Sequence, residues 1–483
     1  MDLTTPFLRA RFAAPAPESV IATASLGSAL DGLRTRLSAG SAIVAPGDPD
    51  YGQRRMLLNR RFDYKPGAIV MCGTEQDVAA TIRFARDQQL RISIRAGGTS
   101  PGGFSSNDGG VLLDLSRLGG ISIDASGPSV RVGTGTLLQP LVEKVGPAGL
   151  MVPVGECMPV GLSGLAMGGG FGLLSRSLGL TCDNILEARI VLADGTVLTA
   201  SERENPDLFW ALRGAGVGNF GVVTSLTMRL HPLPPSVAFA TIVWPLAQAA
   251  DVLKAALTYF ADEAPDELDA LISMLPLPSG ERVLGTLAIY KGAPDIGTKV
   301  LSRLTGLGKP SQSKVDTSPY YKVLTGIPNQ ARDIHDYYKS GFVTGVLPDR
   351  AIEILVDRFA RTEEHAPAIE NMVMFELAGG AINRVDPTAT AFVHRTHTLL
   401  LSIVATWQGP AGAPNPPEKA WADELYRDLG PFYSGEVYQN YPDLELTDYA
   451  QAYYGRNLPR LRELKRRYDS ENVFRFPQGI LPA

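Results

Sequence analysis

Two glycine-dense segments have the residue types and spacing to bind an anionic or planar ligand. The first, RAGGTSPGG at residues 95–103, follows the alternating run RISIR, which predicts a strand. Gly97 and Gly98 can adopt backbone angles closed to other residues, and successive N–H groups in such a turn can bind a pyrophosphate. Taken alone, this loop is more typical of an ordinary glycine-rich turn.

The second segment, GECMPVGLSGLAMGGGFG at residues 155–172, is the most glycine-dense part of the chain. Its glycines would let the backbone lie flat against a planar or phosphate-bearing ligand. Cys157 lies among them, whereas Cys72 and Cys182 are interpreted as small buried hydrophobic residues. The odd number of cysteines, three, and the lack of C-x-x-C spacing disfavour a disulfide framework and a thiolate zinc site.

Two further motifs indicate chemistry that we do not expect here. GVGNFG at residues 216–221 matches G-x-G-x-x-G, but it follows a predicted helix and leads into a β-branched run, the reverse of a nicotinamide-binding motif. His394 and His397 form the closest histidine pair and lie in a stretch, residues 392–407, that predicts a strand. Residues three apart on a strand point to opposite faces, so we expect no shared metal.

The composition is that of a soluble globular protein, with 45% hydrophobic and 20% charged residues among 483. The net charge of −5 argues against general nucleic-acid binding. The six Lys and Arg residues from Arg456 to Arg467 therefore predict a solvated helix face. Because the sequence has neither a run of about 18 apolar residues nor a signal peptide, we expect a cytoplasmic protein with reduced thiols.

Alternating strand and helix patterns must position the glycine-rich segments. Residues 68–72, 76–89 and 91–95 predict a strand, a helix and a strand, which together form a βαβ unit. HPLPP at residues 231–235 should interrupt all regular structure and mark a domain boundary. Two successive helix-plus-strand blocks follow, and they predict a large, mostly antiparallel sheet with helices on one face. The predicted fold class is α+β.

In this order, the motifs resemble those of the berberine-bridge-enzyme-like flavoprotein oxidases of the vanillyl-alcohol-oxidase superfamily. The resemblance extends over nearly the whole chain. It implies a PCMH-type FAD-binding domain in two parts, residues 1–235 and 437–483, with a substrate domain at residues 236–436 between them. The matching segments are NRRFDYKPGAIVMCGTEQDVAATIRFAR, RAGGTSPGG, VLLDLSRL, GECMPVGLSGLAMGGGFG, GLTCDNI, WALRGAGVGNFGVVTSLTMRLHPLP, VYQNYPDL, YYG and LRELKRRYDSENVFRFPQGI.

The resemblance implies FAD as the cofactor. Family members often attach the flavin through a histidine of a GGHS motif and a cysteine of the second glycine-rich segment. Here Thr99 replaces that histidine and excludes a histidyl link, whereas Cys157 matches the family cysteine and could form a single thioether. The expected cofactor-binding residues are Arg95, Gly97, Gly98, Thr99, Ser100, Gly102, Cys157, Val160, Gly161, Gly164, Gly168, Gly169, Gly170, Gly172, Gly221, Val223 and Asn440.

The resemblance also implies hydride transfer from a substrate carbon to the flavin, with a tyrosine of a Y-x-N-Y motif as the base. Tyr441 is the expected base. Its rivals are Tyr438, on the same face of a predicted strand, and the nearby Tyr449, Tyr453 and Tyr454. A free tyrosine has a pKa near 10, so a base role requires a neighbour that favours the phenolate. The alternative is a packed tyrosine whose hydroxyl binds a carbonyl. Arg395 could lower the pKa of Tyr441 or steer an anionic group. The favoured alternative is a structural role, in which His394 and Arg395 together anchor the sheet.

Three functions remain open at this point. The first is an FAD-dependent oxidase that produces H2O2, which is favoured because Val160 matches a position where valine lets O2 approach the flavin. The second is a flavin dehydrogenase with another acceptor, and the third is a redox-neutral cyclase. The expected substrate is a secondary metabolite or sugar with an alcohol, hemiacetal or amine-type carbon. We expect no nucleic-acid or membrane partner, and a monomer or homodimer.

Overall fold

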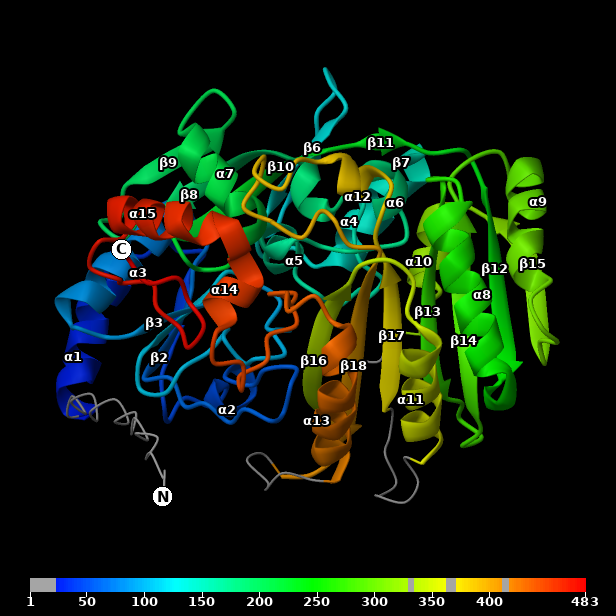
Figure 1. Ribbon diagram of the computed structural model, residues 1–483. Helices are drawn as coiled ribbons and strands as arrows, with labels where there is room; N and C mark the ends of the chain where they lie inside the picture. Colours follow the sequence, from blue (N-terminus) through cyan, green and yellow to red (C-terminus); the bar gives the residue numbers. More distant parts are fainter. Residues whose placement is uncertain (1–22, 329–333, 362–370, 411–416) are drawn as a thin grey trace, which may run out of the picture.

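The computed structural model describes residues 23–328, 334–361, 371–410 and 417–483 (Figure 1). Mixed helices and sheets confirm the α+β class. Within the described ranges, no helix combines the length and apolar character needed to cross a membrane.

A four-stranded sheet carries the first glycine-rich loop. The predicted strand, helix and strand are confirmed, but β2 and β3 do not pair directly, because each pairs in parallel with β4 between them. The side chain of Thr74 accepts a hydrogen bond from Asp77 N and caps α3, whose apolar face packs on the sheet. The elements are α1 (Thr23–Arg34), β1 (Ala42–Val44), α2 (Tyr51–Arg54), β2 (Ala68–Met71), α3 (Glu75–Asp87), β3 (Ile92–Arg95) and β4 (Val111–Asp114).

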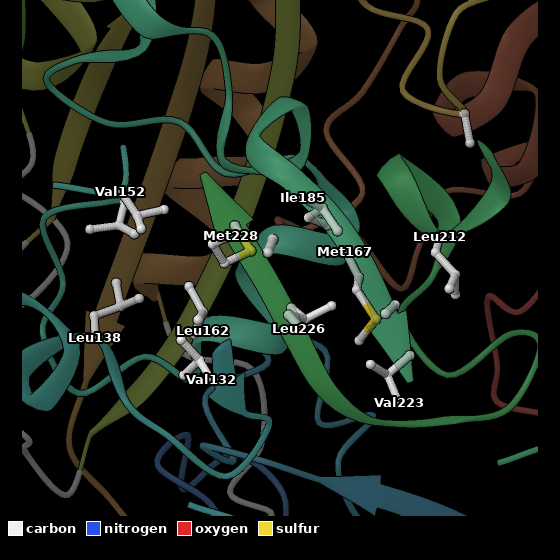
Figure 2. Close-up of a cluster of buried hydrophobic side chains, with 14 of the residues drawn as sticks. Val132, Leu138, Val152, Leu162, Met167, Ile185, Leu212, Val223, Leu226 and Met228 are labelled. Atoms are coloured by element: carbon white, nitrogen blue, oxygen red, sulfur yellow. The ribbon is translucent and has the colours of Figure 1, made fainter. Parts of the chain in front are cut away.

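A five-stranded antiparallel sheet, in the order β5-β6-β10-β8-β9, carries the second glycine-rich segment. Figure 2 shows its core, where side chains of β6, β8 and β10 meet those of α4, α5 and α7. The elements are β5 (Ile121–Ile123), β6 (Ser129–Gly133), α4 (Leu138–Val145), β7 (Leu150–Met151), α5 (Leu162–Gly168), α6 (Ser175–Leu178), β8 (Ile185–Val191), β9 (Val197–Ser201), α7 (Pro206–Ala215), β10 (Val222–Arg229) and β11 (His231–Pro232).

The middle of the chain forms a seven-stranded, wholly antiparallel sheet, in the order β15-β12-β14-β13-β17-β18-β16. Helices α8, α9, α11 and α13 cover one face, as predicted (Figure 1). The elements are β12 (Val237–Pro245), α8 (Ala249–Asp262), β13 (Leu268–Pro276), β14 (Arg282–Tyr290), α9 (Pro294–Thr305), β15 (Gln312–Ser318), α10 (Tyr320–Thr325), β16 (His335–Val343), α11 (Asp349–Ala360), β17 (Met372–Leu377), α12 (Ala381–Arg384), β18 (Leu399–Trp407) and α13 (Pro417–Leu429).

The C-terminal segment returns to the N-terminal half of the molecule. Helices α14 (Tyr449–Tyr454) and α15 (Leu458–Tyr468) follow the large sheet, and α15 packs against α7 (Figure 1). The prediction of a solvated basic helix is wrong at one position. Lys465 is fully buried, 2.7 Å from Asp469, and it also donates to the Asn219 carbonyl.

Three local predictions need correction. Residues 392–398 are not strand, because β18 begins only at Leu399. HPLPP does not interrupt all regular structure, because its first two residues form β11 and pair with β7. Tyr438 and Tyr441 lie in a turn rather than on a strand, and Tyr441 N donates to Tyr438 O over 3.0 Å.

Candidate active site

The first glycine-rich loop leaves the carboxyl end of β3. The Arg95 guanidinium forms a buried ion pair with Asp114 of the neighbouring strand, with Nε 2.8 Å from Oδ2, and the stem of this side chain packs against Gly98 of the loop. Gly98 has a φ of +68°, the left-handed region that favours glycine. A Cβ on Gly97 would lie 2.5 Å from Gly161 N. The two glycine-rich segments therefore touch, backbone to backbone.

The glycines at the end of α5 pack against other parts of the chain. A Cβ on Gly168 would lie 2.0 Å from the side-chain oxygen of Asn440, and one on Gly170 would lie 2.3 Å from the Thr181 hydroxyl. Gly170 has a φ of +90°, and its N–H donates to the Tyr438 hydroxyl over 2.7 Å. The lack of side chains here lets the C-terminal turn approach α5 closely.

The second segment also has an accessible side. Cys157 is exposed, although the surrounding protein atoms desolvate its thiol and raise its pKa to about 11. Gly164 is exposed, and a Cβ there would meet no atom within 4 Å. A glycine-lined backbone with an accessible thiol fits a flavin dinucleotide, which needs close main-chain approach along its length.

The other predicted cofactor residues lie around these two segments. Thr99 and Ser100 are half-buried in the first loop, and a Cβ on Gly102 would meet Pro442 at 2.9 Å. Val160 is half-buried, and its carbonyl accepts from Leu138 N over 2.9 Å. The remaining predicted residues are enclosed by protein. A Cβ added to Gly169 would meet Phe392, one on Gly172 would meet the Val154 carbonyl oxygen, and one on Gly221 would meet the Val191 carbonyl oxygen. Val223 lies in the core of the five-stranded sheet (Figure 2).

The C-terminal turn holds the two candidate tyrosines in different settings. Tyr438 is buried, and its hydroxyl accepts from Gly170 N and from Asn440 Nδ2, the latter over 3.0 Å. Asn440 Nδ2 also donates to the Leu165 carbonyl over 3.1 Å, which ties the turn to α5. These bonds occupy the Tyr438 hydroxyl and suit a positioning role.

Tyr441 instead faces a carboxyl group. Its hydroxyl donates to Glu376 Oε1 of β17 over 3.1 Å, and its ring stacks on Tyr338 with centroids 5.2 Å apart. Burial and the nearby Glu376 carboxylate raise the pKa of Tyr441 well above its usual value. The phenol therefore stays protonated at neutral pH, and it can accept a proton only while passing its own to Glu376.

Glu376 is a buried carboxyl that can take that proton once it is ionised. Burial raises its pKa to about 8, and the carboxyl of Glu156 adds to the effect. Its second oxygen, Oε2, has no hydrogen-bond partner among the described residues, because the Ser402 hydroxyl lies nearby but outside bonding geometry. Burial also raises the pKa of both Glu156 and Asp269 to about 7.

Sequence reasoning missed Glu376. It stands in the apolar run MVMFEL with no motif around it. The available signal was a single acidic residue within an otherwise apolar strand, since buried carboxyls occur mainly where they are paired or functional.

Arg395 has the structural role that the sequence favoured. Its guanidinium is fully buried and binds Asp183 through both terminal nitrogens, over 2.8 and 2.6 Å. It therefore anchors the irregular segment before β18 and does not contact Tyr441 through these bonds.

The two histidines beside Arg395 turn to the same side, whereas opposite faces were expected. His394 Nδ1 and His397 Nε2 lie 2.5 and 2.9 Å from the same oxygen, Oε2 of Glu436. The strand assumption fails because this segment is irregular, so both imidazoles turn to one side, where Phe342 stacks on them. The spacing is compatible with a metal ion, but hydrogen bonds of these lengths already satisfy the carboxylate.

Comparisons with known proteins agree with this arrangement. A family model described as FAD binding domain matches residues 66–201, and one described as Berberine and berberine like matches residues 437–481. The uncharacterized FAD-linked oxidoreductase YgaK of Bacillus subtilis is 32% identical over 91% of this chain and 96% of its own. The (R)-6-hydroxynicotine oxidase of Paenarthrobacter nicotinovorans is 32% identical over 93% and 98%.

A solved structure extends the likeness to three dimensions. Wild-type Physcomitrella patens BBE-like 1 superposes with a TM-score of 0.84 at 28% identity, over 94% of this chain and 98% of that one. The chain therefore belongs to the berberine-bridge-enzyme-like FAD-linked oxidoreductases, and it is an FAD-dependent enzyme with their PCMH-type fold.

Proposed function

We propose that the enzyme oxidises a small molecule by removing a hydride from a substrate carbon and a proton from the adjacent N–H or O–H group. The observation that carries this proposal is the hydrogen bond from Tyr441 to Glu376. Tyr441 stacks on Tyr338, and the Cys157 thiol of the second glycine-rich segment is close enough to influence the pKa of Tyr338. FAD, when bound, accepts the hydride. Residues 1–235 and 437–483 would hold it, and residues 236–436 would hold most of the substrate.

Tyr441 and Glu376 act as one proton-accepting pair. Tyr441 would take the substrate proton on its phenolic oxygen while its own proton moves to Glu376 Oε1, 3.1 Å away. Tyr438 would position the turn through its bonds to Gly170 N and Asn440.

Cys157 would attach the cofactor through a single thioether, since Thr99 cannot form a histidyl bond. The exposed position of its sulfur supports this role. Acid precipitation of the purified protein tests it: a yellow pellet is expected from the wild type and a yellow supernatant from Cys157→Ser. Cys72→Ser, which changes a buried cysteine, is the matched control and should leave the pellet yellow. A colourless wild-type pellet with yellow supernatant contradicts the bond.

We infer that O2 is the electron acceptor, with H2O2 as the product. The names of several relatives support this inference, among them the (R)-6-hydroxynicotine oxidase and the glucooligosaccharide oxidase of Sarocladium strictum. Oxygen uptake on mixing the reduced enzyme with air distinguishes an oxidase from a dehydrogenase. Lasting anaerobic bleaching of the flavin by substrate distinguishes both from a redox-neutral cyclase.

Tyr441→Phe tests the proposed base. Anaerobic flavin reduction, measured with a substrate that reduces the wild type, should slow about 100- to 10,000-fold, the usual contribution of general base catalysis. Tyr449→Phe is the matched control, because that hydroxyl donates to the Gly479 carbonyl. A loss below about tenfold in Tyr441→Phe would show that Tyr441 is not the base.

A further inference from the structure

The two edges of the seven-stranded sheet have different surroundings. At the β16 edge, another segment continues the hydrogen bonding: Phe342 N donates to the Glu436 carbonyl over 3.1 Å, and Ser434 N donates to the Phe342 carbonyl over 2.9 Å. At the other edge, β15 pairs with β12, and no further segment of the described residues forms backbone hydrogen bonds with its outer side (Figure 1). The outer N–H and C=O groups of β15 can therefore pair with another strand.

The side chains of β15 are also accessible. Residues 312–315 and Thr317 are exposed, whereas Asp316 and Ser318 are half-buried. Val315, at the centre of the strand, is 36% exposed and is one of four exposed large hydrophobic residues in the described part of the chain. An exposed edge strand with an apolar residue at its centre is a typical place for the addition of another strand.

Alternate residues of β15 lie on opposite faces of the sheet. Val315 is opposite Ala240 of β12, which belongs to the core under the helices, so Val315 lies on the face that α9 covers. Lys314 and Asp316 lie on the other face, where they form an ion pair with Nζ 2.7 Å from Oδ2. The apolar residue at the centre of the strand is thus flanked by two opposite charges.

This order of residues is complementary to itself in an antiparallel pair. When two β15 strands pair with Val315 opposite Val315, residues equally far from the centre lie opposite each other. Lys314 of each copy then lies opposite Asp316 of the other copy, and Ser313 lies opposite Thr317. Opposite charges in directly opposed positions stabilise an antiparallel pair, whereas like charges destabilise it.

We propose that β15 is a dimerisation edge, at which two copies of this chain pair antiparallel about a two-fold axis through Val315. The seven-stranded sheets of the two copies then form one continuous sheet. The same residues contribute from both copies, so the interface is complete with two copies and closes there. This inference is independent of the function proposed above.

The charges of β15 have partners both in the single chain and in the dimer. In the single chain, the Asp316 carboxylate accepts from Thr317 N over 2.8 Å and pairs with Lys314. The Lys314 and Asp316 side chains are 74% and 45% exposed, so this solvated pair contributes little to stability. In the dimer, each carboxylate exchanges its own lysine for Lys314 of the other copy. A lysine on an edge strand usually prevents pairing, but here an aspartate lies at the opposed position.

Sedimentation velocity of the flavin-loaded protein from about 1 to 100 µM tests this edge, because a single pair of strands forms a small interface of modest affinity. The wild type should shift from monomer towards dimer across this range. Lys314→Asp places an aspartate opposite Asp316 on both sides of the axis, so it should raise the dimer Kd at least about tenfold. Lys65→Asp, at an exposed lysine before β2, is the matched control and should leave the Kd unchanged.

A mixing experiment tests the register of the pair. Asp316→Lys alone should dimerise as poorly as Lys314→Asp alone. An equimolar mixture of the two variants should recover the wild-type Kd to within about threefold, because every lysine then lies opposite an aspartate. Recovery on mixing also excludes misfolding as the reason for weak dimerisation of the single variants. A wild type that stays monomeric, a dimer that Lys314→Asp leaves unchanged, or a mixture that fails to dimerise overturns the proposal.

Discussion

Two glutamates contact the C-terminal turn from different sides, and they differ sharply in proton affinity. Glu436, just before the turn, accepts from two imidazoles, and these donors outweigh desolvation to hold its pKa well below the usual value. Glu376 of β17 accepts from the Tyr441 hydroxyl at the end of the turn, and burial beside the Glu156 carboxyl raises its pKa to about 8, although Tyr441 and Ser402 both lower it. Two imidazoles beside one carboxyl, and burial next to a second carboxyl at the other, therefore separate the pKa values of the two glutamates.

Glu376→Gln tests whether Glu376 is the glutamate that exchanges a proton during flavin reduction. An amide cannot accept the Tyr441 proton, so we expect flavin reduction to slow about 100-fold. The wild-type rate should rise with pH through about 8, because Glu376 must be ionised to act, and the variant should lose this rise. Anaerobic stopped-flow measurements from pH 6 to 10 check both. Glu353→Gln, on the exposed face of α11, is the control and should keep the wild-type profile.

The same variant should change stability with a predictable sign. The folded pKa of Glu376 lies above its unfolded value of about 4.5, so its contribution is most favourable below pH 4.5 and is lost as the pH rises to about 8. The thermal midpoint of Glu376→Gln should therefore rise relative to the wild type across this range. A difference in thermal midpoint between the variant and the wild type that stays constant with pH would contradict the raised pKa of Glu376.

Glu436→Gln tests whether Glu436 stabilises the fold. Loss of the charged acceptor for His394 and His397 should lower the free energy of unfolding by about 1–2 kcal/mol at pH 7, a value reduced for partial exposure. Because the folded pKa of Glu436 is depressed, its contribution is present above about pH 4.5 and is lost as the pH falls further. Denaturant unfolding of the wild type and the variant at pH 7 and pH 4 measures the difference in the free energy of unfolding and its decrease at the lower pH. A large loss of flavin reduction rate with unchanged stability would reverse the roles of the two glutamates.

Tyr438→Phe should have the smallest effect and sharpens the assignment of the base. The change removes the acceptor for Gly170 N and should cost about 1 kcal/mol of stability. Flavin reduction should slow only a few-fold, because the turn shifts but the Tyr441–Glu376 pair remains. Parallel stopped-flow and unfolding measurements test this. A rate loss equal to that of Tyr441→Phe would identify Tyr438 as the base.

Periodic segments could be predicted from the sequence because their local patterns agree with their final environments. The pattern over 76–89, for example, predicts α3. Strand β16 could not be found in this way, because Lys339 interrupts its apolar pattern. That lysine is buried only because Asp443, 104 residues later, lies 2.8 Å from its amine.

The site residues that belong to sequence motifs could be predicted, whereas those brought into the site by long-range packing could not. The two glycine-rich segments and Tyr441 stand in recognisable motifs. Glu376 becomes a partner of Tyr441 only when β17 meets a turn 65 residues further on. The segment before β18 looked like strand because it is rich in apolar and β-branched residues. Its irregular path depends on Asp183 and Glu436, which are distant in sequence.

The contact between Gly170 and Tyr438 spans 268 residues of chain, and it has a consequence for biosynthesis. A ribosome must complete nearly the whole polypeptide before α5 can meet the turn that packs on it. Nascent chains therefore pass through a long stage in which this glycine-rich helix end is without its partner. Because contacts of such separation form late, this stage is the one in which the chain is most exposed to aggregation.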